Sequence, residues 1–303
     1  MSGPTKVAFI GLGVIGFPVA GHISKVAQIT VFNRTYEKAL NWKSQYCGNI
    51  AASPAEAAAD ADYVFTCVGN DNDLLEVTLG EKGVIQGMKP SAILIDHTTA
   101  SAEAARTLYS TLKNKGCEFI DAPVSGGQPG AINGQLTVMC GGDADSFEKA
   151  KLIIQHYSKA VTLMGEAGSG QLTKMVNQIC IGGLLQGLSE AINFAIRAKL
   201  DPTKVIEVIS KGAAQSWQMD NRYKSMIEGF YEHGFAVDWM RKDFAICFDE
   251  ARKNGAALPV TALVDQFYAE VQQLDGGRWD TSSLLARLQH TDQSFKKTGG
   301  KSH

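Results

Sequence analysis

Gly11, Gly13 and Gly16 stand directly after an apolar, strand-like segment (7–10) and before a helix-like run (17–26). In such a turn the first glycine permits the tight bend, the second lets backbone approach a pyrophosphate, and the third lets the helix pack close to the strand. The helix that begins there directs its free N–H groups toward the phosphates. We therefore expect a dinucleotide site at this glycine turn (residues 11–16). Its predicted cofactor-binding residues are Gly11, Leu12, Gly13, Val14, Ile15 and Gly16.

The second strand-like segment (29–32) ends in Asn33, Arg34 and Thr35. A site for NAD usually holds an acidic residue here to bind the ribose hydroxyls, and none is present. The guanidinium of Arg34 can instead bind a 2′-phosphate, with Asn33 and Thr35 as polar support. We therefore expect NADP as the preferred cofactor and NAD as the alternative. The competing interpretation is that Arg34 is a solvated turn residue.

A loop of small residues, Ser125-Gly126-Gly127, follows the strand-like segment that ends at Asp121. Its backbone N–H groups and the Ser125 hydroxyl could hold an anion such as a substrate carboxylate. Taken alone, however, a Ser-Gly-Gly loop is more often a plain turn.

Lys174 lies on the apolar stretch of a long helix-like segment, where a charge is costly unless it has a function or a partner. Gln178, four residues later, shares its face, and Asn177 lies beside it. Near a nicotinamide, the lysine could give a proton to a carbonyl oxygen as hydride arrives and remove it in reverse. The alternative, which the residues alone favour, is a lysine that reaches water from the first turns of the helix.

The elements that must position these residues alternate between strand-like and helix-like segments in the first half of the chain. Polar loops follow the strand-like segments, and the carboxyl ends of parallel strands are where such sheets bind ligands. This rhythm is typical of an α/β fold with a doubly wound, mainly parallel sheet of the Rossmann type. The further strand-like segments are 49–51, 63–68, 92–96, 117–121 and 136–140.

The second half shows helical periodicity alone. After a glycine-containing joint at 165–170, which we expect to be flexible, apolar residues recur in steps of three and four. They predict a largely buried helix over 169–199, roughly 45 Å long. The remaining helix-like segments are 203–212, 217–230, 238–254, 259–274 and 281–289.

We therefore expect three parts: an NADP-binding Rossmann domain over 1–165, an all-helical domain over 166–295, and a disordered tail over 296–303. The long helix over 169–199 would connect the first two parts.

The composition of the 303-residue chain agrees with an enzyme that acts on small molecules. A net charge of −2 argues against nucleic acid or an anionic membrane as partner. No run of 18 apolar residues and no signal peptide is visible, so we expect a cytoplasmic protein. The six cysteines lack C-x-x-C spacing and the six histidines are isolated, which favours buried reduced thiols and no metal site.

Taken together, these segments resemble the β-hydroxyacid dehydrogenase family. It includes 3-hydroxyisobutyrate dehydrogenase, tartronate semialdehyde reductase and the glyoxylate/succinic semialdehyde reductases, and 6-phosphogluconate dehydrogenase is a larger relative. The resemblance covers nearly the whole chain, and four motifs in the family's order make the catalytic interpretation of Lys174 the preferred one. The motifs are residues 9–16, residues 121–127 with Gly130, Ala131 and Gly134, residues 168–174, and Lys242-Asp243.

The resemblance implies an NADP-dependent, reversible hydride transfer between a small 3-hydroxy acid, similar to 3-hydroxyisobutyrate or glycerate, and its semialdehyde. Lys174 would be the acid/base, and Ser125-Gly126-Gly127 would hold the substrate carboxylate. Asp243 would help hold Lys242 or a water. The helical domain over 166–295 would serve substrate binding and oligomerisation, and the enzyme would be a homodimer or homotetramer. The further cofactor-binding residues implied are Val68, Gly69, Thr99 and Lys242.

The sequence departs from the family pattern at three places. Ile15 stands where Met or Gln is usual, and Cys67-Val68-Gly69 stands where many members have Met-Leu-Pro. Gln178 stands where many members have Asn, so that Asn177-Gln178 resembles tartronate semialdehyde reductases. Both amides are predicted to bind substrate, and which of them touches it is open.

Three other functions compete with this one. A glyoxylate or succinic semialdehyde reductase is the nearest alternative within the family. The imine reductases commonly have Asp or Tyr at the position of Lys174, which argues against that class. A non-catalytic NADP-binding module would not need Ser125, Lys174 and Lys242. The residues that select the substrate are not fixed: Trp217, Met219, Phe235 and Trp239 could line a pocket or belong to the core.

Overall fold

The computed structural model describes residues 4–290. The chain divides into two compact units, Met1–Lys174 and Met175–His303. The border predicted from the sequence, between residues 165 and 166, lies nine residues before this division. The tail predicted over 296–303 lies outside the described residues.

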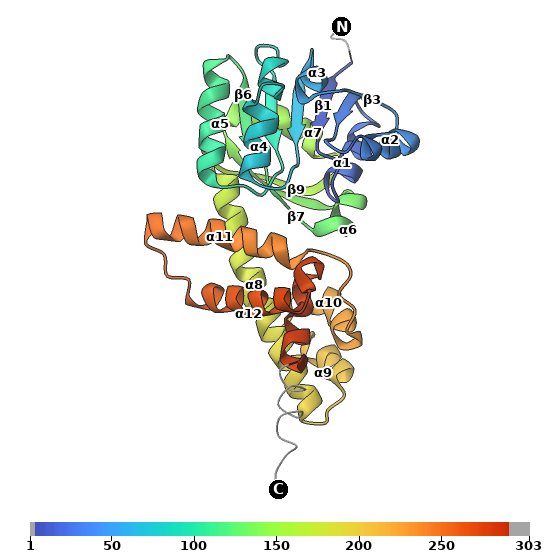
Figure 1. Cartoon of the computed structure of the whole chain (residues 1–303), viewed down its shortest axis with the longest axis vertical. Helices are drawn as coiled ribbons and strands as arrows, with labels where there is room; N and C mark the ends of the chain where they lie inside the picture. Colours follow the sequence, from blue (N-terminus) through green and yellow to red (C-terminus); the bar gives the residue numbers. More distant parts are fainter. Residues whose placement is uncertain (1–3, 291–303) are drawn as a thin grey trace. The chain divides into compact units, whose positions relative to one another are not determined.

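The first unit is built on a sheet whose strands are parallel over its larger part (Figure 1). The parallel strands lie in the order β3-β2-β1-β4-β5-β6, the doubly wound arrangement expected for a dinucleotide-binding fold. The predicted Rossmann-type sheet is thus confirmed. The strands are β1 (Lys6–Ile10), β2 (Gln28–Phe32), β3 (Asn49–Ile50), β4 (Tyr63–Thr66), β5 (Ile93–Asp96) and β6 (Glu118–Asp121).

Beyond β6 the sheet changes character. The strand β8 (Leu136–Gly142) runs antiparallel to β6 and to the short β7 (Val124–Ser125), and β9 (Ser158–Gly165) pairs with β8 in parallel. The strand β9 was not predicted from the sequence. Its residues are exposed or only partly buried, so it lacks the buried apolar face by which a strand is recognised.

Helices cover both faces of this sheet (Figure 1). One apolar core joins the sheet to α1, α2 and α7, and a second joins the opposite face to α3, α4 and α5. Covering both faces explains why the central strands are continuous apolar runs rather than alternating ones. The helices are α1 (Gly16–Ile23), α2 (Tyr36–Gln45), α3 (Pro54–Ala58), α4 (Asp71–Leu79), α5 (Ala102–Asn114), α6 (Gly127–Ile132) and α7 (Ala144–Ile154).

The long helix α8 (Ser169–Arg197) begins in the first unit and continues into the second. The other described elements of the second unit are helical, as predicted. Asp201 caps α9 by accepting hydrogen bonds from the backbone N–H groups of Thr203 and Lys204. The elements are α9 (Pro202–Ile209), α10 (Trp217–Glu228), α11 (Val237–Asn254), α12 (Pro259–Gln273), two short 3₁₀ turns (Gly276–Arg278 and Thr281–Ser283) and a helical stretch over 284–290.

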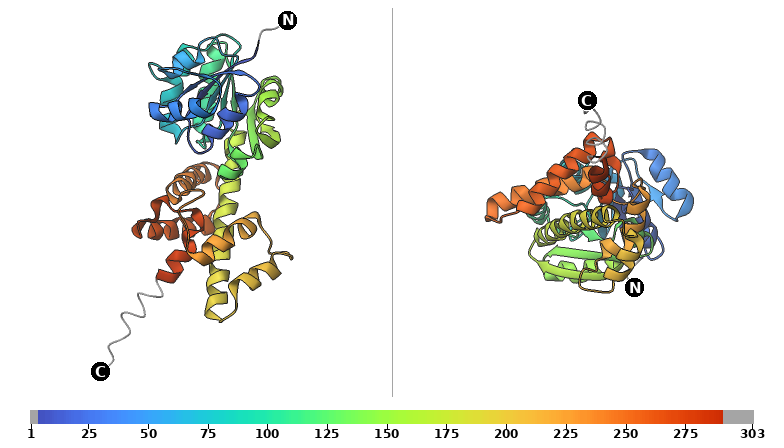
Figure 2. Two further views of the ribbon diagram at one scale, coloured as in Figure 1. Left: turned by 90° about the vertical axis from the view of Figure 1, so that its right-hand side faces the viewer. Right: turned by 90° about the horizontal axis from the view of Figure 1, so that it is seen from below.

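Two apolar cores flank α8 in the second unit. Leu185 of α8 packs in a core with α11 and α12, and Leu188 and Ile192 pack in another core with α9 and α10. Figure 2 (left) shows the gold helices α9 and α10 on one side of the yellow α8 and the orange helices α11 and α12 on the other. By length and composition alone α8 could cross a membrane, and the core helix of a soluble protein meets the same criteria.

The glycine-containing joint at 165–170 differs from the prediction of a flexible segment. The backbone N–H of Gly168 donates a hydrogen bond to Asp121 Oδ1 at 2.7 Å, and α8 begins at the next residue. The joint is therefore tied to the end of β6. Glycine is frequent here because the backbone approaches closely: a Cβ on Gly170 would lie 2.4 Å from the carbonyl oxygen of Met139.

The cysteines are free thiols, as expected, but their burial is mixed. Cys117, Cys140 and Cys247 are buried, whereas Cys47 and Cys180 are exposed. The prediction of buried thiols was therefore wrong for these last two. Within residues 4–290, no three side chains of His, Cys, Asp or Glu gather in a group that could hold a metal ion.

Candidate active site

The glycine turn lies between the carboxyl end of β1 and the start of α1. Gly11 has a φ of +100°, which favours glycine, and a Cβ added there would lie 2.3 Å from the carbonyl oxygen of Cys67. A Cβ on Gly16 would lie 2.0 Å from the carbonyl oxygen of Gly11. These two glycines are therefore required by the close packing of the turn itself.

Gly13 differs from its two neighbours because a Cβ there would meet no atom within 4 Å. Its backbone faces open space beside the start of α1, whose first turn contains no acidic residue. An anion is favoured at such a position by the helix N–H groups and dipole. The residues of the turn therefore fit a pyrophosphate group.

Asn33, Arg34 and Thr35 follow β2 as predicted, but they do different things. Asn33 Oδ1 accepts a hydrogen bond from the backbone N–H of Leu12 at 2.8 Å, and its Nδ2 donates to the carbonyl of Thr35. The side chain of Arg34 is 87% exposed and forms an ion pair with Asp73. Asn33 thus braces the glycine turn, and the guanidinium of Arg34 lies accessible to an anion.

The loops after β4 and β5 are joined to each other. The backbone N–H of Val68 donates to Thr98 Oγ1 at 3.1 Å, and the backbone N–H of Thr98 donates to Asp96 Oδ1 at 3.0 Å. Gly69 follows in the same partly buried loop, and Thr99 is also partly buried. The structure therefore brings together the predicted cofactor-binding segments around Val68 and Thr99, and it places the glycine turn against Cys67.

Two buried carboxylates end neighbouring strands, Asp96 on β5 and Asp121 on β6, and they are register partners in the sheet. Burial raises the pKa of Asp96 to about 7 and that of Asp121 to about 6. Asp96 Oδ1 accepts from Thr66 Oγ1 at 2.8 Å, whereas Asp96 Oδ2 has no hydrogen-bond partner among the described residues. Both carboxylates were missed as functional candidates, although Asp at the end of two adjacent apolar strands was a visible signal.

The start of α8 is bound to these loops. Asp121 Oδ2 accepts from the backbone N–H of Gln171 at 2.9 Å. The Gln171 side chain, fully buried, donates to the carbonyl of Thr98 at 2.7 Å and accepts from the N–H of Ala100 at 3.0 Å. Lys174 follows one turn later and is only 8% exposed. Its burial goes against the alternative of a lysine that reaches water from this helix.

Ser125, Gly126 and Gly127 join β7 to α6. Gly126 has a φ of +124° and Gly127 a φ of +59°, conformations that favour glycine. Ser125 and Gly126 are partly buried, Gly127 is exposed, and Ser125 pairs with Thr137 of β8 in the sheet. The loop follows β7, which lies two strands away from β6 in the sheet order β5-β6-β8-β7.

The predicted site residues of the second unit are linked to one another by hydrogen bonds and an ion pair. Gln178 is buried on α8; its Nε2 donates to Asp243 Oδ2 at 2.6 Å, and its Oε1 accepts from Asn177 Nδ2 at 2.8 Å. Lys242 of α11 forms an ion pair with the other oxygen of Asp243 at 3.0 Å. The expected role of Asp243 in holding Lys242 thus has a direct contact behind it.

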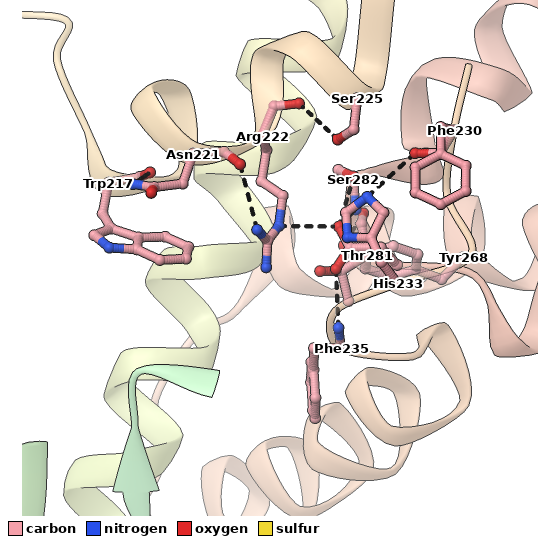
Figure 3. A network of polar contacts seen from close by, with 11 residues as sticks. Trp217, Asn221, Arg222, Ser225, Phe230, His233, Phe235, Tyr268, Thr281 and Ser282 are labelled. Atoms are coloured by element: carbon pink, nitrogen blue, oxygen red, sulfur yellow. Dashed lines mark hydrogen bonds and ion pairs between the residues drawn. The ribbon is translucent and has the colours of Figure 1, made fainter. Parts of the chain in front are cut away.

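Figure 3 shows a second polar network, which includes Arg222, Phe235 and Ser282. The buried Asp280 carboxylate accepts from the backbone N–H of Phe235 at 2.9 Å and pairs with Arg222 at 3.3 Å. The guanidinium of Arg222 lies 5.1 Å from the ring of Trp217. Of the four side chains considered for the pocket, Met219 is buried in the core, Phe235 is partly buried, and Trp217 and Trp239 are exposed.

His97 was also missed as a candidate. Its Nδ1 lies 2.6 Å from the carbonyl oxygen of Ala122 and its Nε2 lies 2.7 Å from Tyr157 Oη. Burial lowers the pKa of His97 to about 4, so the ring is neutral at pH 7. Its contacts link β5 to the segment before β9, which is a structural role.

The strand order, the open glycine turn and the loops that gather after β4 and β5 define a class, the Rossmann-type proteins that bind a dinucleotide. Family profiles agree with this class. Residues 6–165 match the NAD-binding domain of 6-phosphogluconate dehydrogenase, and residues 168–288 match the NAD-binding domain of NADP-dependent 3-hydroxyisobutyrate dehydrogenase. The chain belongs to the β-hydroxyacid dehydrogenase family.

Individual relatives cover nearly the whole chain. It is 61% identical to an uncharacterized oxidoreductase of Shewanella frigidimarina, over 94% of this chain and 98% of that one. It is 37% identical to a probable 3-hydroxyisobutyrate dehydrogenase-like protein of Arabidopsis thaliana, over 94% and 85% of the two chains. The 3-hydroxyisobutyrate dehydrogenase of Mycobacterium tuberculosis, solved with L-serine, shares the fold, with 24% identity, a TM-score of 0.86, and coverage of 94% and 99%. The protein is an oxidoreductase that acts on CH–OH groups.

Proposed function

We propose that this protein is an NADP-dependent β-hydroxyacid dehydrogenase. It would transfer hydride reversibly between a small 3-hydroxy acid, similar to 3-hydroxyisobutyrate or glycerate, and its semialdehyde. The observation that carries the proposal is the burial of Lys174 one turn after Gln171, whose side chain binds the loop that contains Thr99.

Each residue group has a chemical task in this proposal. The glycine turn and the start of α1 would bind the pyrophosphate, and Ser125-Gly126-Gly127 would bind the substrate carboxylate. Lys174 would donate a hydrogen bond to the β-oxygen, release a proton to it during reduction, and take that proton back during oxidation. The bound nicotinamide would supply or accept the hydride.

The catalytic role of Lys174 is tested by its replacement. Lys174→Ala should lower kcat by about 1,000-fold, because proton transfer by a positioned side chain contributes roughly 10²–10⁴-fold. The dissociation constant for NADPH, measured by fluorescence titration, should stay within about threefold of the parent value. An unchanged kcat would rule out Lys174 as the acid/base.

The preference for NADP rests on Arg34. Arg34→Ala should raise KM for NADPH by about 30-fold and leave KM for NADH unchanged, since a charge-assisted contact contributes about 2 kcal/mol. Lys43→Ala, which removes an exposed charge near the end of α2, is the matched control and should change neither constant. Equal use of NADH and NADPH by the parent enzyme would contradict the preference.

The substrate is identified by a panel assayed with both cofactors. It contains 3-hydroxyisobutyrate, D-glycerate, serine, 4-hydroxybutyrate, glyoxylate and tartronate semialdehyde. A 3-hydroxy acid or its semialdehyde should give the highest kcat/KM. Highest activity with glyoxylate or with 4-hydroxybutyrate would favour the second candidate, a glyoxylate/succinic semialdehyde reductase.

For the substrate amide we favour Asn177. Gln178 is buried and its amide bonds to Asp243 and to Asn177, whereas Asn177 is only partly buried. We infer that Gln178 holds Asp243, which in turn holds Lys242. Asn177→Ala should then raise KM for the acid more than Gln178→Ala does.

We further propose that a second copy of the chain covers an apolar face of the second unit. Val176 and Leu184 of α8 and Val260 and Leu263 of α12 are exposed, and Gly183 of α8 approaches Val260. Between Lys174 and Glu190, α8 carries no charged residue, so this face suits self-association. Leu184→Asp should reduce the molar mass in light scattering from that of a dimer or tetramer to that of a monomer.

The cytoplasmic location stays a prediction from the sequence.

A further inference from the structure

Gln171 holds the loop around Thr99 through hydrogen bonds to the two residues on either side of it, Thr98 and Ala100. Its Nε2 donates to the carbonyl of Thr98 and its Oε1 accepts from the N–H of Ala100, so one amide group spans the peptide units on both sides of Thr99. The side chain is fully buried. A buried amide with both ends bonded to backbone fixes the distance and the orientation of the two segments that it joins.

The backbone of Gln171 is fixed as well. Asp121 accepts from the N–H of Gln171 through one carboxylate oxygen and from the N–H of Gly168 through the other, at 2.9 and 2.7 Å. The backbone at Gly170 also lies close to this carboxylate, since a Cβ added there would lie 2.8 Å from Asp121 Oδ2. Gln171 is therefore held at its backbone by β6 and at its side chain by the loop after β5.

This loop is itself anchored to the cofactor side of the sheet. Thr98 receives the N–H of Val68 on its hydroxyl and gives its own N–H to Asp96. At the far end of the loop, Ser101 donates from its N–H and its hydroxyl to Asp71, at the start of α4. Gln171 joins this ordered loop to α8, three residues before Lys174 and on the same side of the helix.

We propose that Gln171 is a positioning residue that sets the register of Lys174 against Thr99 and the loop at Val68. The inference rests on the proposed function, in which Lys174 is the acid/base. Gln171 does not take part in the proton transfer. Its task is to keep the amine within reach of the β-oxygen, because displacement of a reacting group by about 1 Å can cost roughly 100-fold in rate.

The first test is Gln171→Met, which keeps the length of the side chain and removes both hydrogen bonds. We expect kcat to fall about 100-fold, KM for the acid to change less than threefold, and the primary isotope effect with 4-deuterated NADPH to rise because the chemical step becomes slower. Gln186→Met is the matched control: Gln186 is also buried on α8, bonds to Glu190, and lies in the second unit. Its kcat should stay within threefold of the parent value.

The second test is rescue by Gln171→Glu. A protonated carboxyl group offers one donor and one acceptor, as the amide does, whereas the carboxylate cannot donate to Thr98. The kcat of this variant, divided by that of the parent at the same pH, should therefore rise as the pH falls. A ratio that does not change with pH would contradict the positioning role, and so would a folded Gln171→Met variant with kcat within threefold of the parent.

Hydrogen exchange at the Ala100 N–H gives a readout that needs no turnover. In Gln171→Met this amide should exchange at least about tenfold faster than in the parent, and in Gln186→Met at the parent rate. Unchanged exchange in Gln171→Met would overturn the proposal. If the parent enzyme turned over no acid in the panel, the proposed function would fail, and the exchange rates would still decide whether Gln171 holds the loop.

Discussion

Two helices of the first unit begin after a strand and a glycine-containing turn, and their starts are completed in different ways. At α1 the backbone around Gly13 faces open space, and a Cβ added there would have no atom of the chain within 4 Å. At α8 the backbone N–H groups of Gly168 and Gln171 are taken by the buried carboxylate of Asp121. Negative charge is favoured at the start of a helix. At α1 a bound phosphate would supply it, and at α8 the carboxylate of Asp121 supplies it.

The difference separates binding from architecture. A helix start whose N–H groups are open to a phosphate binds a ligand and contributes little to the stability of the free protein. A helix start that already holds a carboxylate fixes the direction of the helix, and here that helix carries Lys174. Substitutions at the two places should therefore change different quantities.

The largest effect is expected on stability at α8. Asp121→Ala leaves two buried N–H groups without an acceptor and should lower the free energy of unfolding of the first unit by about 3 kcal/mol. Asp121→Asn keeps one acceptor oxygen and should cost roughly half as much. Urea unfolding followed by circular dichroism measures both, and an Asp121→Ala protein as stable as the parent would remove the basis of the comparison.

The next effect is on affinity at α1. Gly13→Asp places a carboxylate where a phosphate should bind; two unit charges about 5 Å apart at an effective dielectric constant of about 20 repel by roughly 3 kcal/mol, which is about 100-fold in affinity. The melting temperature without NADPH should not change, since a Cβ there meets nothing. Gly13→Ala is the uncharged control and should weaken NADPH binding less. Equal affinities for all three proteins would show that the pyrophosphate binds elsewhere.

The smallest effect is expected at Asp96, one of the two buried carboxylates at the strand ends. The pKa of Asp96, about 7 in the folded chain, lies above its ordinary value of 3.8, so the stability from its protonated form is complete below pH 3.8 and is lost as the pH rises through 7. Between about pH 5 and 7 the parent should lose about 2 kcal/mol from this group. Asp96→Asn should flatten that slope, and Asp145→Asn, at an exposed position on α7, should leave it unchanged. An identical slope in Asp96→Asn would contradict the raised pKa.

Much of the first unit could be predicted because its signals are local. Apolar runs of four to six residues ending in polar loops identify buried parallel strands, and the glycine spacing identifies the turn between β1 and α1. The strand β9 was missed although residues 160–164 form a mainly apolar run, and none of its residues is buried. The joint at 165–170 was expected to be flexible from its glycines, and the partner that ties it, Asp121, lies 47 residues away from Gly168.

The candidate site divides in the same way. Lys174 and the Ser125 loop were predicted as site residues from the order of the family motifs, since residue type and spacing alone favoured a lysine that reaches water and a plain turn. The contacts of Asn33 and Gln178 depend on partners that no local pattern reveals. Asn33 was expected to support a 2′-phosphate, and its Oδ1 accepts a hydrogen bond from the N–H of Leu12. Gln178 was expected to meet the substrate, and the partner of its amide is Asp243, 65 residues later. Long-range pairs of this kind require the folded structure.

The position of the donors to Asp121 also fixes where the first unit can be cut. A fragment that stops at residue 165, the border suggested by the sequence, keeps the carboxylate and loses the N–H groups of Gly168 and Gln171 that satisfy it. A fragment that continues to Lys174 keeps both. In gene fusions or in exchanges of the cofactor-binding half between relatives, the first two turns of α8 therefore belong with the half that precedes them.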